Sequence, residues 1–360
     1  MYYKVRHYQY KNRIGNLRAE AVGVVSGEKH FPIFPGNMIF KPLTKSKPFS
    51  TPLYAYAEVF WSTIINEYFM PAPRYELAIC EGYEAANEKY LDYGTTVPMA
   101  YKEGENLLNL LEFFRKYPDE KVDIDNYVNY CQMFYDYRDI FEADFFQEHQ
   151  EMAEQLAMQV LISVLKGDQN YHYENVAFLC DKDGGIISLA PMIDHEFSTY
   201  FMFPDDISRH VYWLMELSKS IRGGEVRPGE YDNFKDPEER KLMEKSATCI
   251  HKNLLYIKEH YPQTTEEFLD KAEKLKTALT EASEDFLIRG NTEYSDCADS
   301  SAWLIGKARY KDKDEEKASA YEAELYGKGK KLDFRDVSIS AINEIKAVIS
   351  QMEEVLGKRE

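Results

Sequence analysis

Two kinds of hydrophobic pattern divide this chain into a strand-rich first part and a helical second part. Short β-branched and apolar runs at 19–26, 36–42 and 75–80 are bounded by Gly, Pro and Ser, which is typical of strands. Residues 52–69, between the second and third runs, carry apolar side chains at helical spacing. The first 83 residues therefore predict a small β-rich unit with one helix.

From about residue 84 the apolar residues instead form longer stripes at helical spacing. Helices are predicted over 104–117, 123–146, 150–167 and most of the chain after about residue 207, ending in 337–356. One β-hairpin interrupts them, with strands at 176–180 and 186–190 around a Gly-containing turn. The charge-dense stretch 307–331 predicts a solvated or mobile segment.

Composition and charge narrow the classes of function. The hydrophobic content of 44% and charged content of 29% are ordinary for a soluble globular protein. The net charge of −18 disfavours a broad nucleic-acid or anionic-membrane surface, although it allows a local basic pocket for a phosphorylated ligand. The five cysteines are widely spaced, so neither a zinc cluster nor a disulfide framework is expected.

Neither a signal peptide nor a membrane span is visible in the sequence. No run approaches the ~18 apolar residues that a transmembrane helix needs. A cytoplasmic protein without a membrane partner is therefore expected. The oligomeric state is left open.

Polar side chains gather at both ends of the predicted hairpin. Asn175 directly precedes its first strand and Asp194 follows its second, so an antiparallel hairpin returns them to the same end. Both offer hard oxygen ligands, which Mg²⁺ accepts together with phosphate oxygens and water. Taken alone, each residue is better explained as a cap of a strand or turn; the pair at this spacing favours a metal site. His172 is expected to fix the loop by hydrogen bonds and not to bind metal.

The sequence GDQNYHYENVAFL, followed by LAPMIDHEFS, resembles the signature of HipA-like protein kinases. In that family a D-x-H-x-x-N catalytic loop precedes a hairpin and an "apolar-A-P-apolar-apolar-D" metal site. Asn175 and Asp194 match the metal-binding Asn and Asp of the family, and His172 matches its loop His. The resemblance implies ATP and Mg²⁺ as cofactors. It also implies an α+β, bilobal protein-kinase-like fold, with a small β-rich N-lobe at 1–83 and a larger helical C-lobe at 84–360.

The resemblance also assigns nucleotide-binding residues to the N-lobe. Lys41 matches the strand lysine that grips the phosphates, and Glu58 matches the helix glutamate that holds this lysine through a charge-assisted pair. In isolation, a solvent-exposed lysine and a first-turn acid favoured by the helix dipole explain these two residues better. By order along the chain, the phosphate-covering loop falls at Ser26 and Gly27, and the adenine-binding hinge falls at Glu81 and Tyr83.

The chain departs from the family where the catalytic base is expected. The Asp that precedes the loop His by two residues corresponds here to Asn170, while Asp168 stands where family members tend to carry Asn. An amide can orient a hydroxyl but cannot accept its proton. Three explanations are open: a reshaped loop in which Asp168 reaches the acceptor, a pseudokinase that binds nucleotide but transfers little, or an engineered Asn170 that traps a nucleotide-bound state.

The leading hypothesis is an ATP-dependent serine/threonine-type protein kinase of the HipA-like class, with chemistry weakened or altered at Asn170. The resemblance implies toxin-like or signalling kinases that act on cellular proteins and sometimes on themselves. Ser198, Thr199 and Tyr200 are then candidate modification sites, although ordinary packing explains them better. One alternative is a small-molecule kinase with a hydroxylated, cationic acceptor. Another is a nucleotide-binding pseudokinase or a partner-binding module that docks through the helical region 240–360.

Overall fold

The computed structural model describes thirteen stretches of the chain. They are residues 3–13, 16–19, 33–34, 38–42, 53–83, 89–98, 105–123, 135–168, 171–195, 198–201, 207–224, 237–286 and 334–357. Three of the predicted site residues, Ser26, Gly27 and Asn170, lie outside these stretches. Lys41, Glu81 and Tyr83 lie on described strands, but their side chains are outside the described part.

A six-stranded sheet gathers the N-terminal strands in the order β2-β1-β5-β6-β4-β3. The strands are β1 (Tyr3–Arg13), β2 (Asn16–Ala19), β3 (Ile33–Phe34), β4 (Met38–Pro42), β5 (Glu76–Tyr83) and β6 (Lys89–Pro98). Strand β1 runs parallel to β5, and the other pairs are antiparallel. Strand β6 lies beyond residue 83 and pairs with both β4 and β5, so the sheet includes chain from both sides of the predicted lobe boundary. That division stays a prediction.

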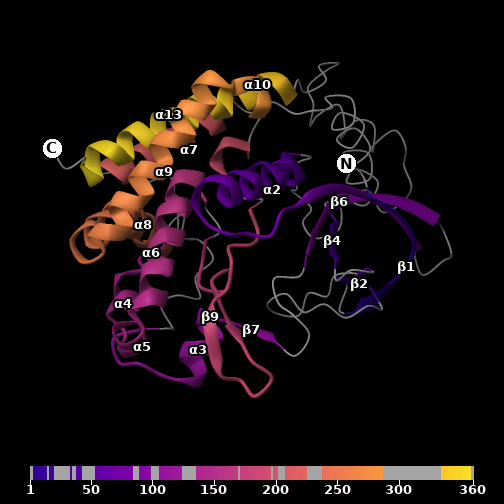
Figure 1. Cartoon of the computed structure of the whole chain (residues 1–360), viewed down its shortest axis with the longest axis horizontal. Coiled ribbons are helices and arrows are strands. Elements are labelled where there is room, and N and C mark those ends of the chain that lie inside the picture. Colours follow the sequence, from indigo (N-terminus) through magenta and orange to yellow (C-terminus); the bar gives the residue numbers. More distant parts are fainter. Residues whose placement is uncertain are drawn as a thin grey trace.

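Helix α2 (Leu53–Ile64) lies between this sheet and the helical part of the molecule (Figure 1). It continues into a short π-helical turn, η1 (Ile65–Phe69). Ala57, Trp61, Ile64 and Ile65 of this segment are buried, because they form one apolar face that packs into the main core. The helix predicted over 52–69 is therefore confirmed, and its position joins the two parts of the fold.

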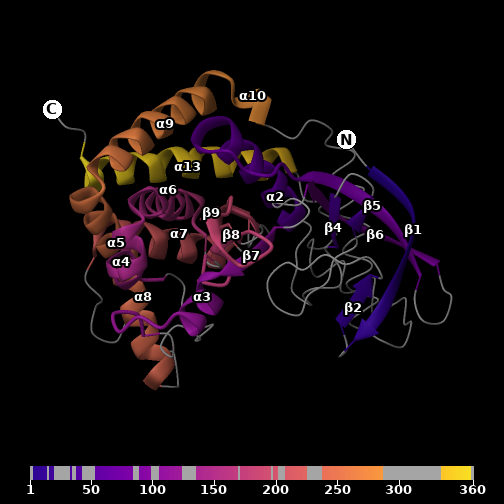
Figure 2. The same cartoon turned by 60° about the horizontal axis from the view of Figure 1, so that its bottom comes forward.

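The remaining helices form a layered bundle around α6, as both views show (Figures 1 and 2). They are α3 (Leu110–Lys116), α4 (Arg138–Glu142), α5 (Asp144–Glu148), α6 (Gln150–Lys166), α7 (Ile207–Arg222), α8 (Pro237–His260), α9 (Pro262–Glu281), α10 (Ser283–Phe286) and α13 (Phe334–Leu356). Every residue of α6 from Leu156 to Lys166 is buried. A helix that is apolar on all sides belongs in a core, so α6 supplies the rigid centre from which the candidate site departs.

A three-stranded sheet with the order β7-β8-β9 lies beside this bundle. Its strands are β7 (Asn106–Asn109), β8 (Ala177–Cys180) and β9 (Ile186–Leu189). The hairpin β8–β9 confirms the sequence prediction. The helix predicted over 104–117 is wrong in its first part, because residues 106–109 pair with β8 and the helix begins only at Leu110.

The helix predicted over 123–146 is also wrong where the structure describes it. Two short helices, α4 and α5, replace its last part, with Ala143 in an extended conformation between them. The charged stretch 307–331 lies outside the described residues. The α+β class is confirmed, with helices predominating. Among the helices that the structure describes, none combines the length and apolar character needed to cross a membrane.

Candidate functional site

The hairpin β8–β9 brings the chain back to the end at which it began. At its turn, the Asp181 carboxylate accepts hydrogen bonds from the backbone N–H groups of Asp183 and Gly185, both at 2.8 Å. At its open end, the N–H of Ala190 donates to the carbonyl of Ala177 at 2.7 Å. The loop that carries Asn175 therefore enters the hairpin, and the segment that carries Asp194 leaves it, at the same end.

The loop before β8 is fixed by short-range hydrogen bonds. The N–H of Asn175 donates to the carbonyl of His172 at 2.8 Å, and the N–H of Glu174 donates to His172 Nδ1 at 3.2 Å. The N–H of Leu110, at the start of α3, is shared between the carbonyls of Tyr173 and Val176. The His172 ring accepts a hydrogen bond within its own loop and packs edge-on against Tyr135, with ring centroids 6.1 Å apart, and Asn175 is half-buried at the loop's end.

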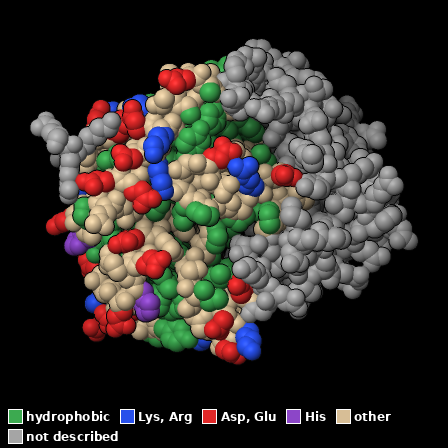
Figure 3. Space-filling view, viewed as in Figure 1, with side chains coloured by type: hydrophobic (Ala, Val, Ile, Leu, Met, Phe, Trp, Pro, Cys, Tyr) green, Lys and Arg blue, Asp and Glu red, His purple; other side chains and the backbone are tan. Residues whose placement is uncertain are grey.

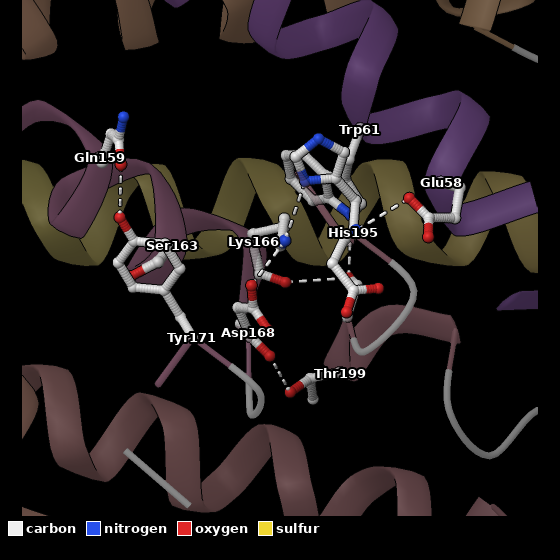
Figure 4. Close-up of polar contacts among 12 residues, drawn as sticks. Glu58, Trp61, Gln159, Ser163, Lys166, Asp168, Tyr171, His195 and Thr199 are labelled. Carbon is white, nitrogen blue, oxygen red and sulfur yellow. Dashed lines mark hydrogen bonds and ion pairs between the residues drawn. The ribbon is translucent and has the colours of Figure 1, made fainter. Parts of the chain in front are cut away.

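A buried side-chain network connects this loop to the core helix. The Tyr171 hydroxyl donates to Gln159 Oε1 at 2.8 Å (Figure 4). Gln159 Nε2 in turn donates to the carbonyl of Ala190 at 2.8 Å. One glutamine of α6 therefore holds both flanks of the hairpin. Burial raises the pKa of Tyr171 well above its ordinary value, and the negative charge of Asp168 raises it further.

Asp194 has a backbone conformation that few non-glycine residues adopt. Its φ is 62°, in the left-handed region, which costs roughly 1–2 kcal/mol for most residues with a Cβ and which Asp and Asn adopt more often than the others. Two neighbouring hydrogen bonds hold it there. The N–H of Asp194 donates to the Tyr75 hydroxyl at 3.2 Å, and the next N–H, that of His195, donates to Glu58 Oε2 at 2.9 Å. Both acceptors come from the α2 to β5 segment, so the first part of the fold fixes the backbone after the hairpin.

A buried cation lies beside this backbone, as Figure 4 shows. Lys166, the last residue of α6, has its Nζ 2.5 Å from an Asp168 carboxylate oxygen and 3.1 Å from His195 Nδ1. The Lys166 side chain is 0% exposed and that of Asp168 is 2% exposed. Because an ammonium only donates hydrogen bonds, His195 Nδ1 must accept. His195 is therefore neutral, with its proton on Nε2.

The three hydroxyl side chains at 198–200 cap the end of α6. The hydroxyl of Tyr200 donates to the carbonyl of Leu165, that of Ser198 to Lys166, and that of Thr199 to Gly167, at 2.7–2.9 Å. The last carbonyls of a helix have no partner within it, so these hydroxyls replace water.

All three of these residues are buried. Trp61 of α2 also donates its Nε1–H to Ser198 Oγ at 2.9 Å. The structure therefore gives Ser198, Thr199 and Tyr200 the packing role that the sequence favours over modification.

A cavity of about 20 Å³ lies under the loop. Asp168, Tyr171, Tyr137 and Asn253 are among the residues that line it. This volume is that of one water molecule, so the cavity belongs to the interior of the loop and not to a nucleotide site.

Of the two loop residues that the sequence offers as acid–base candidates, the structure describes only Asp168. The Asp168 carboxylate faces Lys166 inside the protein, while Asn170 lies outside the described residues. Glu58 is also buried, where the sequence in isolation favours an exposed acid. Among the described residues, no group of three or more His, Cys, Asp and Glu side chains is arranged to hold a metal ion. A site of the predicted kind differs from such a group, since it takes one amide and one carboxylate from the protein.

Sequence reasoning missed Lys166, His195 and Tyr75. A lysine in the last turn of a helix is normally solvent-exposed and favoured by the helix dipole. The signal that could have found it is the run LAMQVLISVL just before it, in which eight of ten residues are apolar, because such a run predicts burial of the whole helix end. For Tyr75 and His195 we find no such signal, because their contacts join segments 119 and 137 residues apart in sequence.

No protein-family model matches the chain, and no curated protein matches its sequence. The chain is similar to a solved structure titled "Crystal structure of A Helicobacter pylori proinflammatory kinase CtkA". The two share 11% sequence identity with a TM-score of 0.41. The similarity covers 90% of this chain and 99% of the other. The function proposed below rests on the site and not on this similarity.

Proposed function

We propose that this chain is an ATP-dependent kinase with a bilobal, protein-kinase-like arrangement, in which Asn175 and Asp194 bind the Mg²⁺ of the nucleotide. The observation that carries the proposal is the backbone of Asp194. A carboxylate residue sits in a strained conformation at the end of a hairpin, with Tyr75 and Glu58 holding it from another part of the fold. Strain maintained by its surroundings in this way is concentrated at functional sites.

The donor set fits magnesium. Asn175 and Asp194 supply hard oxygen atoms, both residues are half-buried, and both leave the hairpin at the same end. Mg²⁺ commonly takes one or two protein oxygens and completes its shell with phosphate oxygens and water. When bound, the metal would neutralise charge on the transferred phosphoryl group. The protein's own contribution is to hold these two oxygen donors at one place.

The nucleotide itself is proposed to lie against the six-stranded sheet. Lys41 and the loop at Ser26 and Gly27 would hold its phosphates, and the β5 end at Glu81 and Tyr83 would hold its adenine. Glu58 takes a further role in this scheme. Because its carboxylate binds the N–H of His195, it links the nucleotide-binding part to the metal-binding segment.

Phosphoryl transfer to the acceptor hydroxyl is proposed to be slow. Asp168 is buried in an ion pair with Lys166, so its carboxylate is not presented to an acceptor. The position next to the hydroxyl then falls to Asn170, whose amide orients a hydroxyl but does not take its proton. The proposed acceptor is a serine or threonine of a protein, in line with the HipA-like resemblance. A small cationic hydroxyl compound is the alternative within the kinase class.

A partner-binding module is the second candidate, because helix α7 exposes large apolar side chains. Val211, Tyr212 and Met215 are 46%, 42% and 65% exposed. In the described part of the region 240–360, two residues are equally exposed, Leu255 and Ile339, and they stand singly on different helices. If the chain acts by docking, α7 is a second surface to test beside the C-terminal region 240–360 that the sequence suggests.

A thermal-shift titration tests the proposal. ATP with Mg²⁺ is expected to raise the melting temperature in a saturable way, because a ligand that binds only the native state stabilises it. Asp194→Ala should abolish the magnesium-dependent part of the shift. Asp183→Ala is the matched control, since Asp183 is an exposed acid in the turn of the same hairpin. No shift of the wild-type protein with ATP or ADP, with or without metal, would reject the kinase and favour the partner-binding module.

Radiolabelled ATP then separates the kinase alternatives. Label on protein supports a protein kinase, and label only on small solutes supports a small-molecule kinase. Asn170→Asp is expected to raise phosphoryl transfer, because it supplies a carboxylate where an amide stands. Equal, non-zero transfer by the wild type, Asn170→Asp and Asp194→Ala would contradict the assignment of both residues.

A further inference from the structure

The charged side chain of Lys166 is enclosed at the junction of three segments. It ends helix α6, faces Asp168 at the start of the loop, and contacts His195 in the segment after the hairpin. Removing a cation from water is costly unless it is paired and hydrogen-bonded. Asp168 supplies the opposite charge and His195 supplies a neutral acceptor. In the cluster of Lys166, Asp168 and His195, one cation therefore donates to one anion and one neutral acceptor, and the charges cancel.

Each partner of Lys166 is itself bonded to other elements. The backbone of Asp168 forms an antiparallel bridge with Ser198, and its N–H donates to the carbonyl of Ser163. The N–H of His195 donates to Glu58 of α2. A shift of the Lys166 ammonium would therefore move the loop start, or the backbone of Asp194 and His195, or both.

We infer that Lys166 is a positioning residue for the candidate metal site, a role that rests on the proposed function. By donating to His195 Nδ1 it holds the imidazole on the inner side of the segment. The backbone of Asp194 is held between this imidazole and the Tyr75 hydroxyl. The ring of Tyr75 also packs edge-on against His195, with ring centroids 5.7 Å apart. Lys166 therefore acts on Asp194, the candidate metal ligand, only through His195, and in this scheme it does not contact the nucleotide.

A purely structural ion pair makes a different prediction. Breaking a buried pair leaves one charge alone and destabilises the whole protein, whereas replacing both charges with neutral groups of similar size restores stability. If the pair serves only stability, the double variant Lys166→Met/Asp168→Asn should match the wild type in every local property. If Lys166 also positions His195, the double variant should fold normally and still have a loosened segment at 194–195.

The test compares the wild type, Lys166→Met, Asp168→Asn and the double variant of the full chain. Urea unfolding establishes that the double variant is close to the wild type in stability. Hydrogen exchange is then followed in peptides that end at residue 195. The N–H groups of Asp194 and His195 are expected to exchange about tenfold faster or more in the double variant, because each depends on an anchored backbone. Amides of α9 should be unchanged.

Lys276→Met is the matched control. Lys276 forms a partly buried ion pair with Glu353 between α9 and α13, at 2.9 Å. This variant is expected to lose stability without changing the exchange of Asp194 and His195. The inference would be overturned if the double variant were as stable as the wild type and its two amides exchanged at the wild-type rate. This holds whether or not the protein binds nucleotide.

The magnesium requirement tests the link to the metal. In the double variant, the Mg²⁺ concentration that half-saturates ATP binding should rise about tenfold, while metal-free nucleotide binding stays the same. Faster exchange with an unchanged magnesium requirement would overturn the assignment of Lys166 to the metal site. If the wild type shows no magnesium-dependent ATP binding, the proposed function fails, and the exchange result alone decides whether Lys166 positions the segment.

Discussion

The Glu58 carboxylate of helix α2 accepts a hydrogen bond at 2.9 Å from the backbone N–H of His195. The two residues are 137 positions apart in sequence and both are buried. Glu58 is predicted from sequence to pair with Lys41. The finding shows that α2 is also bonded to the segment that leaves the hairpin, directly after Asp194. A hydrogen bond therefore links the first part of the fold to the segment that carries Asp194, the candidate metal ligand.

Replacing Glu58 should separate these two parts. Glu58→Ala leaves the buried His195 N–H without this acceptor and is expected to lower the free energy of unfolding by about 1–3 kcal/mol. Glu58→Gln keeps an oxygen acceptor and should cost less. Urea unfolding measures both. Glu67→Ala is the control, since Glu67 forms an exposed pair with Arg74 and should cost about 0–1 kcal/mol. Equal losses for Glu58→Ala and Glu67→Ala would contradict the buried hydrogen bond.

The hydroxyl cap on α6 predicts which substitutions at 198–199 are tolerated. Thr199→Val removes the donor to the Gly167 carbonyl and should cost about 1 kcal/mol. Ser198→Asp places a carboxylate in a fully buried position and should cost several times more, or prevent folding. Thermal melts of the purified variants measure the difference. A Ser198→Asp protein as stable as the wild type would show that this segment tolerates the charge of a phosphate.

Replacing Gly167 with Ala should destabilise the fold more than the same change at Gly184, which also has a positive φ. Its φ is 58°, and a Cβ there would lie 3.0 Å from the Thr199 side chain. Gly167→Ala therefore combines the left-handed penalty, roughly 1 kcal/mol, with a steric contact. Gly184 has φ 85°, but a Cβ there would meet only the flexible end of Lys116, at 4.0 Å, so Gly184→Ala carries the backbone penalty alone. Denaturant midpoints of the two variants provide the comparison. A smaller loss at Gly167 than at Gly184 would contradict this packing.

Alkaline pH should destabilise the fold through its buried tyrosines. Burial raises the pKa of Tyr171, Tyr137 and Tyr200 well above the ordinary value, and raises that of Tyr261 to about 12. Below about pH 10 both the folded and the unfolded chain keep these protons. Above it the unfolded chain ionises first, so the free energy of unfolding falls as the pH rises through the folded pKa values.

Urea unfolding between neutral pH and pH 11 measures this fall. Tyr171→Phe removes one of the ionising groups, so the free energy of unfolding should fall less steeply with pH in the alkaline range. The variant should also be less stable at neutral pH, because Gln159 Oε1 loses its donor. A slope equal to that of the wild type would show that Tyr171 ionises alike in both states.

The elements with the strongest local patterns could be predicted. Helix α6 and the hairpin β8–β9 follow directly from a long apolar stripe and from two short runs around a Gly-containing turn. Strand β7 could not, because NLLNLLEFF is apolar enough for either a strand or a helix. The pairing with β8 decides it, and that pairing is a long-range contact.

The residues of the candidate site also fall into those that could be predicted from the sequence and those that could not. Asn175 and Asp194 were singled out by residue type and spacing, and Glu58 by the resemblance to HipA-like kinases. Lys166 was not, because a single lysine carries no pattern of its own. Its importance comes from Asp168 and His195 closing around it, which requires the packed fold. Sequence can name groups that contact a ligand more readily than groups that hold those contacts in place.

The cap formed by Ser198, Thr199 and Tyr200 has a consequence for control. Phosphorylation of a hydroxyl can order or melt a segment because it adds negative charge. Here the three hydroxyls already close the end of a core helix, so the stretch is locked as soon as the chain folds. Adding a phosphate to any of the three would first require these hydrogen bonds to break, so phosphorylation here would open the segment instead of ordering it.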